Sequence, residues 1–144
     1  MPIDDKVLVD FAQQIVESAS SEVEFRCSIG RAYYAGFHSV IGIACRLPES
    51  DSFKESSSHL SHHEVGARLR KWDVSDVCGS WTRLKPTAST LSDLLNTCRA
   101  SRVVADYRLN RSVNKSDAKM QIARVKQIRV IVKQLEAAES SQAA

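Results

Sequence analysis

Residues 26–47, RCSIGRAYYAGFHSVIGIACRL, lie in the most apolar segment of the chain. Ser28, Ala32 and Gly36 recur there every four residues, so they form one row of small side chains along a helix. A row of small side chains lets a neighbouring helix approach closely. Pro48 follows and ends the segment, because proline cannot continue a helix. The stretch therefore predicts a helix over about 21–46 that packs at the centre of an all-α protein.

The other segments show the same helical periodicity. Apolar residues at spacings of three and four predict a first helix over about 3–19, and Ser21 with Glu24 matches a capping box before the second. Asn114 and Asp117 predict the start of the last helix. Further helices are predicted over 59–72 and 87–109, with a short one inside 73–87. We expect an up-and-down bundle of four long helices plus a short fifth, one domain over 1–138, and a frayed tail over 139–144.

Composition supports one soluble domain. The chain has 144 residues, of which 43% are hydrophobic, and this is enough for one core. It has no apolar run of about 18 residues that would span a membrane, and its first residues are acidic rather than a basic and apolar leader. We expect a cytoplasmic protein without membrane contact. The cysteines have no C-x-x-C spacing, so we expect buried, reduced thiols rather than a zinc site or disulfides. They are Cys27, Cys45, Cys78 and Cys98.

Charge is unevenly distributed along the chain. After Asn96 there are ten Lys or Arg and four acids, whereas up to Asn96 there are ten and thirteen. A basic C-terminal third favours partners that carry phosphate. The same excess is also typical of an ordinary solvated helix face.

Arg31 and His38 are two helical turns apart, about 10.5 Å along one face of the predicted second helix. RNA cleavage without a metal needs a histidine to move a proton and an arginine to stabilise the phosphate. The alternative is that the two side chains make buried hydrogen bonds and ion pairs with neighbouring helices.

A second polar cluster follows in the sequence, because Arg99, Arg102 and Asp106 share one helix face. Arg102 and Asp106 would form an intrahelical pair, or Arg99 and Arg102 would hold a phosphate with Asp106 orienting them. The run His59-Leu-Ser-His62-His63-Glu64 has metal-ligand spacings but lacks a defined fourth ligand. No phosphate loop or nucleophile elbow is present in the sequence. We expect no metal and no cofactor.

Four segments in this order resemble the HEPN superfamily: RCSIGRAYYAGFHSVIGIACRL, SHHEVGARL, LLNTCRASRVVADYRLN and DAKMQIARVKQI. The resemblance covers about 20–135. It implies an all-α bundle that dimerises, and either an RNA-cleaving toxin or defence nuclease or a non-catalytic partner of a nucleotidyltransferase. In the nuclease members, an arginine, four to six intervening residues and then a histidine make up a motif, and the motifs of two subunits form one composite site.

Arg31 and His38 match that spacing. The family's nuclease motif, however, lies at the start of a later helix, where Arg102-Val-Val-Ala-Asp-Tyr107 has no histidine. Arg102 then stands for the motif arginine, and His38 is the candidate for the missing histidine.

The leading hypothesis is a homodimeric, metal-independent endoribonuclease of toxin or defence type. Its catalytic residues would be Arg31, His38, Arg102, Asp106 and Tyr107, and its nucleic-acid-binding residues would be Arg99, Arg108 and Arg111. One alternative is a non-catalytic module that binds RNA or a nucleotide, or that docks a nucleotidyltransferase antitoxin. Another is a structural dimerisation domain whose polar residues join its helices.

Overall fold

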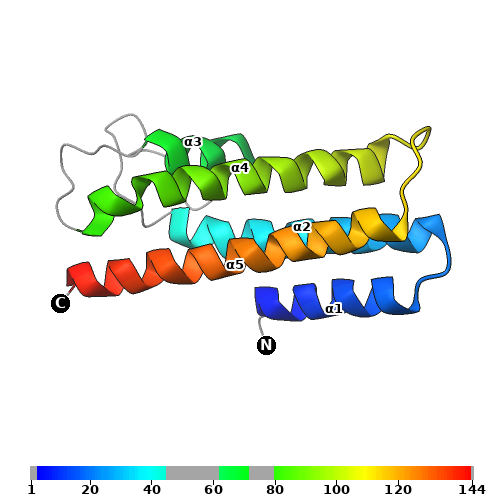
Figure 1. The fold of residues 1–144 in the computed structure, drawn as a ribbon, viewed down its shortest axis with the longest axis horizontal. Coiled ribbons are helices and arrows are strands. Elements are labelled where there is room, and N and C mark those ends of the chain that lie inside the picture. The colour runs from blue at the N-terminus through cyan, green and yellow to red at the C-terminus, as the bar shows by residue number, and fades with distance from the viewer. Residues whose placement is uncertain (1–2, 45–61, 72–79, 144) are drawn as a thin grey trace.

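The chain is all-α in a computed structural model that describes residues 3–44, 62–71 and 80–143. These residues form five helices and no strand. The helices are α1 (Asp5–Ser18), α2 (Glu22–Ala44), α3 (His62–Lys71), α4 (Ser80–Tyr107) and α5 (Lys115–Ala143). Figure 1 shows α4, α5 and α1 as long, roughly parallel rods with α2 behind α5. None of the described helices is long and apolar enough to cross a membrane.

Helix α2 lies at the centre because it contacts all four other helices. The predicted small-residue row makes two of these contacts. The Ser28 hydroxyl donates a hydrogen bond to the Ala12 carbonyl of α1 at 2.8 Å. A Cβ atom at Gly36 would meet Val125 and Ile128 of α5 at 3.4 and 3.5 Å, so α5 packs directly on the glycine backbone. The predicted close helix crossing is confirmed.

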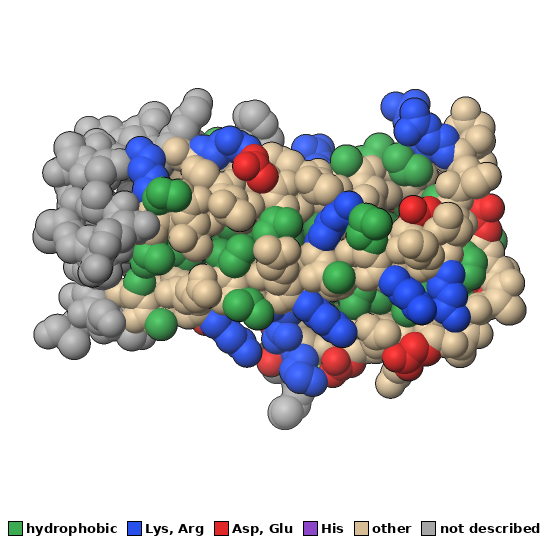
Figure 2. All heavy atoms as spheres, in the orientation of Figure 1, with side chains coloured by type: hydrophobic (Ala, Val, Ile, Leu, Met, Phe, Trp, Pro, Cys, Tyr) green, Lys and Arg blue, Asp and Glu red, His purple; other side chains and the backbone are tan. Residues whose placement is uncertain are grey.

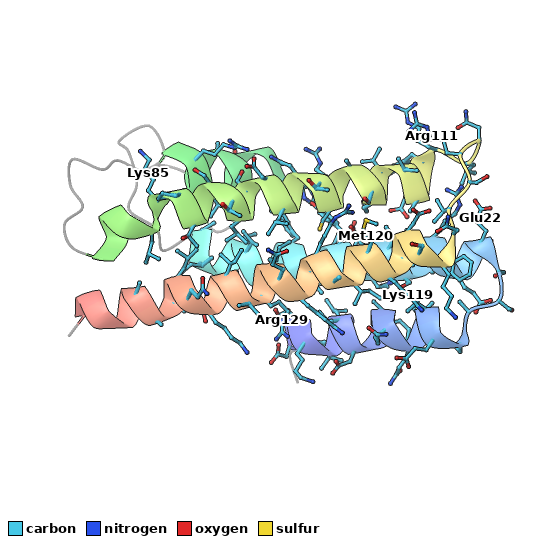
Figure 3. The ribbon with its side chains drawn as sticks, in the orientation of Figure 1. Glu22, Lys85, Arg111, Lys119, Met120 and Arg129 are labelled. Atoms are coloured by element: carbon cyan, nitrogen blue, oxygen red, sulfur yellow. The ribbon has the colours of Figure 1, made fainter. Side chains whose placement is uncertain are left out.

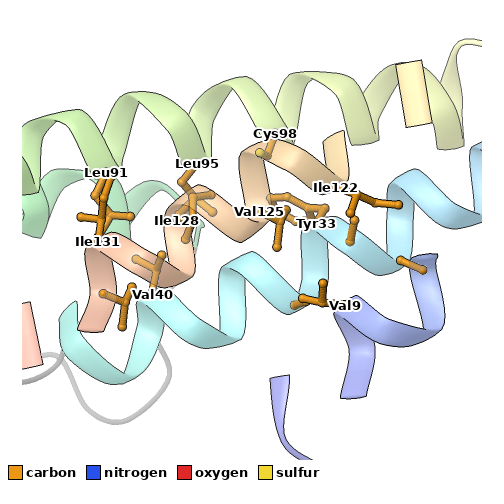
Figure 4. Close-up of a cluster of buried hydrophobic side chains, with 14 of the residues drawn as sticks. Val9, Tyr33, Val40, Leu91, Leu95, Cys98, Ile122, Val125, Ile128 and Ile131 are labelled. Carbon is orange, nitrogen blue, oxygen red and sulfur yellow. The ribbon is translucent and has the colours of Figure 1, made fainter. Parts of the chain in front are cut away.

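One continuous core joins all five helices, and Figure 4 shows part of it. Tyr33 and Val40 of α2, Leu95 of α4 and Ile128 of α5 belong to it, and α1 contributes Val9. Fully burying one such aliphatic side chain contributes about 1.5–3 kcal/mol. Packing therefore explains why the helices assemble as they do.

The predicted helix starts are satisfied by local hydrogen bonds. Asn114 and Asp117 bond reciprocally, each backbone amide donating to the other's side chain at 2.9 Å. At α2, Glu24 accepts hydrogen bonds from the Ser21 hydroxyl and the Ser20 amide. At α5 the Asn114 side chain thus satisfies a first-turn amide that a helix start leaves without a partner. At α2 the predicted reciprocal pair differs, because the Ser21 hydroxyl donates to the Glu24 carboxylate instead of accepting from the Glu24 amide.

Helix α4 differs from the prediction, which placed a helix start near Thr87 after a separate short helix. It begins at Ser80 and runs through Pro86 without a break. Proline at this position removes only one backbone hydrogen bond, the one that would reach the Thr82 carbonyl. The buried Ala88 and Leu91 beyond it hold the helix on the core. Residues 73–79 lie outside the described part of the chain.

Two smaller expectations also change. Helix α5 continues to Ala143, past the expected end at 138. Cys27 is exposed rather than buried, whereas Cys98 is buried and its burial raises the pKa of the thiol to about 11. Cys45 and Cys78 lie outside the described residues.

Candidate functional site

Arg102 is the centre of a cation and tyrosine cluster on the side of α4 that faces α2. Its Nη2 atom donates hydrogen bonds to the Tyr34 hydroxyl at 3.1 Å and to the Tyr107 hydroxyl at 3.5 Å. The guanidinium carbon also lies 5.5 Å from the Tyr34 ring centre and 5.2 Å from that of Tyr107, which is cation–π distance. Arg102 is thus held between two helices.

Asp106 completes this cluster from one turn further along α4. Its carboxylate lies 2.8 Å from Arg102 Nε, and this is a charge contact rather than an aligned hydrogen bond. The predicted intrahelical pair is therefore present. Burial by itself would lower the pKa of Arg102, but Tyr34, Tyr107 and Asp106 raise it, so the guanidinium stays charged. Gly30 leaves room for the carboxylate, which would lie 3.6 Å from a Cβ at that position.

A buried pair lies under this cluster. The Tyr33 hydroxyl is hydrogen-bonded to Nδ1 of His62, which joins α2 to α3. Burial raises the pKa of Tyr33 to about 12, although the charges of Arg99 and Arg102 oppose the shift. Burial and the same two arginines lower the pKa of His62. Both shifts favour the uncharged forms, a protonated phenol and a neutral imidazole.

Arg31 and His38 are both exposed, so the expectation of buried partners for them is wrong. Neither makes a hydrogen bond or an ion pair with any residue that the structure describes. Arg31 lines a hollow of about 480 Å³ against α1, whose other lining residues include Asp10 and Phe11. These two side chains extend from α2 because it exposes a narrow stripe between α1 and α4.

His38 and Arg102 do not meet within one chain. His38 lines a second hollow of about 480 Å³ with the first turn of α1, Ser39 and Glu136. Arg102 is not among the residues that line this hollow, and His38 is not among those that contact Arg102. Tyr34 lies one helical turn before His38, so the two groups are neighbours along α2 without touching. Arg31 and His38 thus line two different hollows beside α1, whereas Arg102, Asp106 and Tyr107 are in contact with one another.

The three predicted nucleic-acid-binding residues do come together. Arg99, Arg108 and Arg111 line one open hollow of about 510 Å³ on the outer face of α4 and the turn after it. Figure 3 shows Arg111 at the end of the molecule where α4 turns toward α5, and Figure 2 shows basic side chains gathered at that end. Ala100 and Val103 form part of the apolar floor. Such a surface attracts phosphate and offers apolar contact to a base.

The sequence analysis missed Arg26, which is only 8% exposed. Its Nη1 atom donates to the carbonyls of Val104 and Ala105 at 3.1 and 2.9 Å and lies 3.5 Å from that of Arg108. Nη2 bonds the Arg111 carbonyl. A guanidinium placed at the last carbonyls of a helix satisfies acceptors that the helix itself leaves open.

Glu22 holds Arg26 in place. Its Oε1 accepts hydrogen bonds from Arg26 at 2.6 and 3.0 Å and from the Val113 amide at 3.2 Å. These hydrogen bonds lower the pKa of the Glu22 carboxyl. The only signal in the sequence was the spacing of four between Glu22 and Arg26, which is common on helix surfaces.

Within the described ranges, no three His, Cys, Asp or Glu side chains lie close enough together to hold a metal ion. Of the histidine run, His62 instead bonds Tyr33, and His59 lies outside the described residues. The groups that are present can move a proton, at His38, and bind phosphate, at the arginines.

No protein-family model, curated protein or solved structure matches this chain. A function for this chain can therefore be inferred only from its residues and their geometry.

Proposed function

We propose that this protein is an RNA-directed helical bundle of HEPN-like, up-and-down type and a metal-independent endoribonuclease of a toxin or defence system that works as a homodimer. The observation that carries the proposal is the exposed stripe of α2. Arg31 and His38 lie there without a hydrogen bond or ion pair to any described residue, beside Tyr34 and its contact with Arg102, and the His38 ring meets only that of Phe37 edge-on. Acid–base and phosphate-binding groups thus occupy one side of the molecule.

The chemistry would use the RNA's own 2′-hydroxyl as the nucleophile. Its oxygen attacks the adjacent phosphorus, the bond to the 5′-oxygen breaks, and a 2′,3′-cyclic phosphate forms. His38 takes the hydroxyl proton or supplies one to the leaving oxygen. Arg102 and Arg31 stabilise the charge on the phosphate in the transition state. Tyr107 and Asp106 orient Arg102, since both contact its guanidinium.

We propose that a second copy of the chain brings His38 to Arg102, and α1 offers a surface for it. Ile3, Val7 and Phe11 follow one another at steps of four and are 71%, 53% and 49% exposed. The hollow that they line also contains Arg31 and Asp10, a cation and a carboxylate. A surface with an apolar stripe and both charges is complementary to itself, as a two-fold interface requires. The second copy is therefore the occupant that we propose.

A cleavage assay tests the proposal. Purified protein is incubated with a labelled single-stranded RNA in EDTA, and the products are analysed for a cyclic phosphate end. We expect cleavage by the wild type and a loss of about 100-fold or more for His38→Ala and for Arg102→Ala. Lys133→Gln, an exposed change on α5, is the control and should cleave normally. Variants that cut RNA as well as the wild type would contradict the nuclease assignment.

One observation favours a second candidate, a non-catalytic module that binds a nucleotide or docks a nucleotidyltransferase antitoxin. Arg102 is occupied by Tyr34, Tyr107 and Asp106, and no described histidine contacts it. Affinity purification from the native host, followed by mass spectrometry, separates the candidates. A stable complex with a nucleotidyltransferase, together with no RNA cleavage by the free protein, supports the module.

A further inference from the structure

Two hollows meet where α4 ends and the chain turns toward α5. The first, the α4 hollow, has a volume of about 510 Å³ and is lined by Asn96, Arg99, Ala100, Val103, Val104, Arg108 and Arg111. The second, the turn hollow, has a volume of about 300 Å³. Val104 and Arg111 line both of them. The two hollows are therefore adjacent, with Arg111 at their boundary.

The cations of this surface are available to a ligand. The side chains of Arg99, Arg108 and Arg111 are exposed and make no hydrogen bond or ion pair with a residue that the structure describes. In the turn hollow, Arg124 lies 3.5 Å from the Ser101 hydroxyl and keeps further donors. Among the residues that the structure describes, Asp117 is the one acid lining either hollow, and its side chain already accepts a hydrogen bond from the Asn114 amide.

Apolar patches alternate with these cations. Ala100, Val103 and Val104 line the α4 hollow, and Met120 is the exposed apolar side chain of the turn hollow, with the buried Ile29 and Val113 behind it. Arg111 stands between them. Two apolar patches with an arginine between them could contact two successive bases and the phosphate that joins them.

A buried arginine, Arg26, holds the backbone on which this surface is built. Arg26 bonds the carbonyls of Val104 and Ala105 at the end of α4 and that of Arg111 in the turn. Arg26 is buried, so it acts as a positioning residue that sets where Arg111 stands between the hollows. A preorganised site loses less entropy when it binds a ligand.

From this arrangement we propose that the two hollows hold consecutive nucleotides of a single-stranded RNA, with Arg111 on the phosphate between them. This deepens the proposed function and rests on it, since Arg99 of the α4 hollow lies one helical turn before Arg102 on the same face of α4. Duplex RNA would not contact the apolar patches of the two hollows, because its bases are stacked and paired inside the helix. The site therefore selects single strands and guides them toward the cluster.

Fluorescence anisotropy tests this with a labelled 12-nucleotide RNA of mixed sequence, free of internal pairing, and with the same strand in a duplex. For the full chain we expect the single strand to bind at least about tenfold more tightly than the duplex. The double variant Arg108→Gln/Arg111→Gln should lose about tenfold or more in affinity. Its salt dependence should also fall, by about 0.7 in slope for each phosphate contact removed.

Lys126→Gln/Lys133→Gln is the matched control, since it removes the same charge from exposed positions on α5. An equal loss in this control shows general attraction and overturns the inference, as does equal affinity for duplex and single strand. Either result would overturn only this inference, because RNA cleavage is measured separately. If the wild type neither binds nor cuts RNA, the proposed function is overturned, and the inference with it.

Discussion

Arg102 of α4 and Tyr34 of α2 are joined by a hydrogen bond of 3.1 Å, and His38, one turn beyond Tyr34, lies outside that contact. The arginine is thus fixed to the helix that carries the histidine, although no described contact joins the two side chains. In the proposed dimer, a second subunit supplies one of the two residues to each site.

Mixing two inactive variants tests this directly. In a composite site, a subunit with His38→Ala supplies Arg102 to a partner with Arg102→Ala, which supplies His38. Each mixed dimer then has one intact site out of two, and half of the dimers are mixed, so we expect about one quarter of wild-type cleavage. No recovery after subunit exchange, confirmed by mass spectrometry of the mixed dimer, contradicts a site shared in this way.

The apolar stripe of α1 predicts where the subunits meet. Val7→Glu places a charge at the middle of Ile3, Val7 and Phe11, and burying an unpaired charge is costly. We expect the variant to be monomeric in analytical ultracentrifugation at concentrations where the wild type is dimeric. Val23→Glu is the control, because Val23 is 73% exposed but lines neither hollow beside α1, and it should remain a dimer.

Arg26 is expected to be the most sensitive polar residue for stability. Arg26→Ala leaves the carbonyls at the end of α4 without their donor, and charged hydrogen bonds of this kind contribute about 1.5–3 kcal/mol each without being additive. We expect the free energy of unfolding to fall by about 3 kcal/mol, measured by urea denaturation followed by circular dichroism. Arg108→Ala, whose side chain makes none of these bonds, should change it by less than about 0.5 kcal/mol. Equal effects would contradict the role given to Arg26.

His62 should make stability depend on pH. Burial and the charges of Arg99 and Arg102 lower its pKa below the usual 6.5, so the unfolded chain binds a proton that the folded chain resists. The contribution of His62 to the free energy of unfolding is complete above about pH 6.5, its pKa in the unfolded chain. This contribution is lost as the pH falls toward the lower pKa of the folded chain. We expect thermal melts of the wild type to show this loss on acidification and those of His62→Gln to show less of it. An unchanged pH profile in the variant contradicts this explanation.

Two glycines of α2 should respond oppositely to substitution. A Cβ at Gly42 meets nothing within 4 Å, so Gly42→Ala should stabilise the helix by about 0.8–1 kcal/mol through propensity alone. At Gly36 a larger side chain runs into Val125 and Ile128, and Gly36→Leu should destabilise by about 1–3 kcal/mol through overpacking. Chemical denaturation measures both. Stabilisation by Gly36→Leu would show that the crossing is looser than described.

The sequence by itself determined the all-α class, most helix bounds, the small-residue contacts of α2 and the pairing of Arg102 with Asp106. These features depend on spacings of three and four within one helix, which backbone geometry fixes before any packing occurs. The course of α4 through Pro86 could not be predicted from the sequence. It depends on the burial of Ala88 and Leu91 against other helices, which outweighs one missing hydrogen bond.

Only the tertiary structure decided how residues from different helices meet. It exposed Arg31 and His38, turned Arg26 onto carbonyls some 80 positions away along the chain, and gathered Arg99, Arg108 and Arg111 around one hollow. The physical reason is that such contacts depend on the rotation and offset of packed helices. Those are set by the whole core and not by any local pattern.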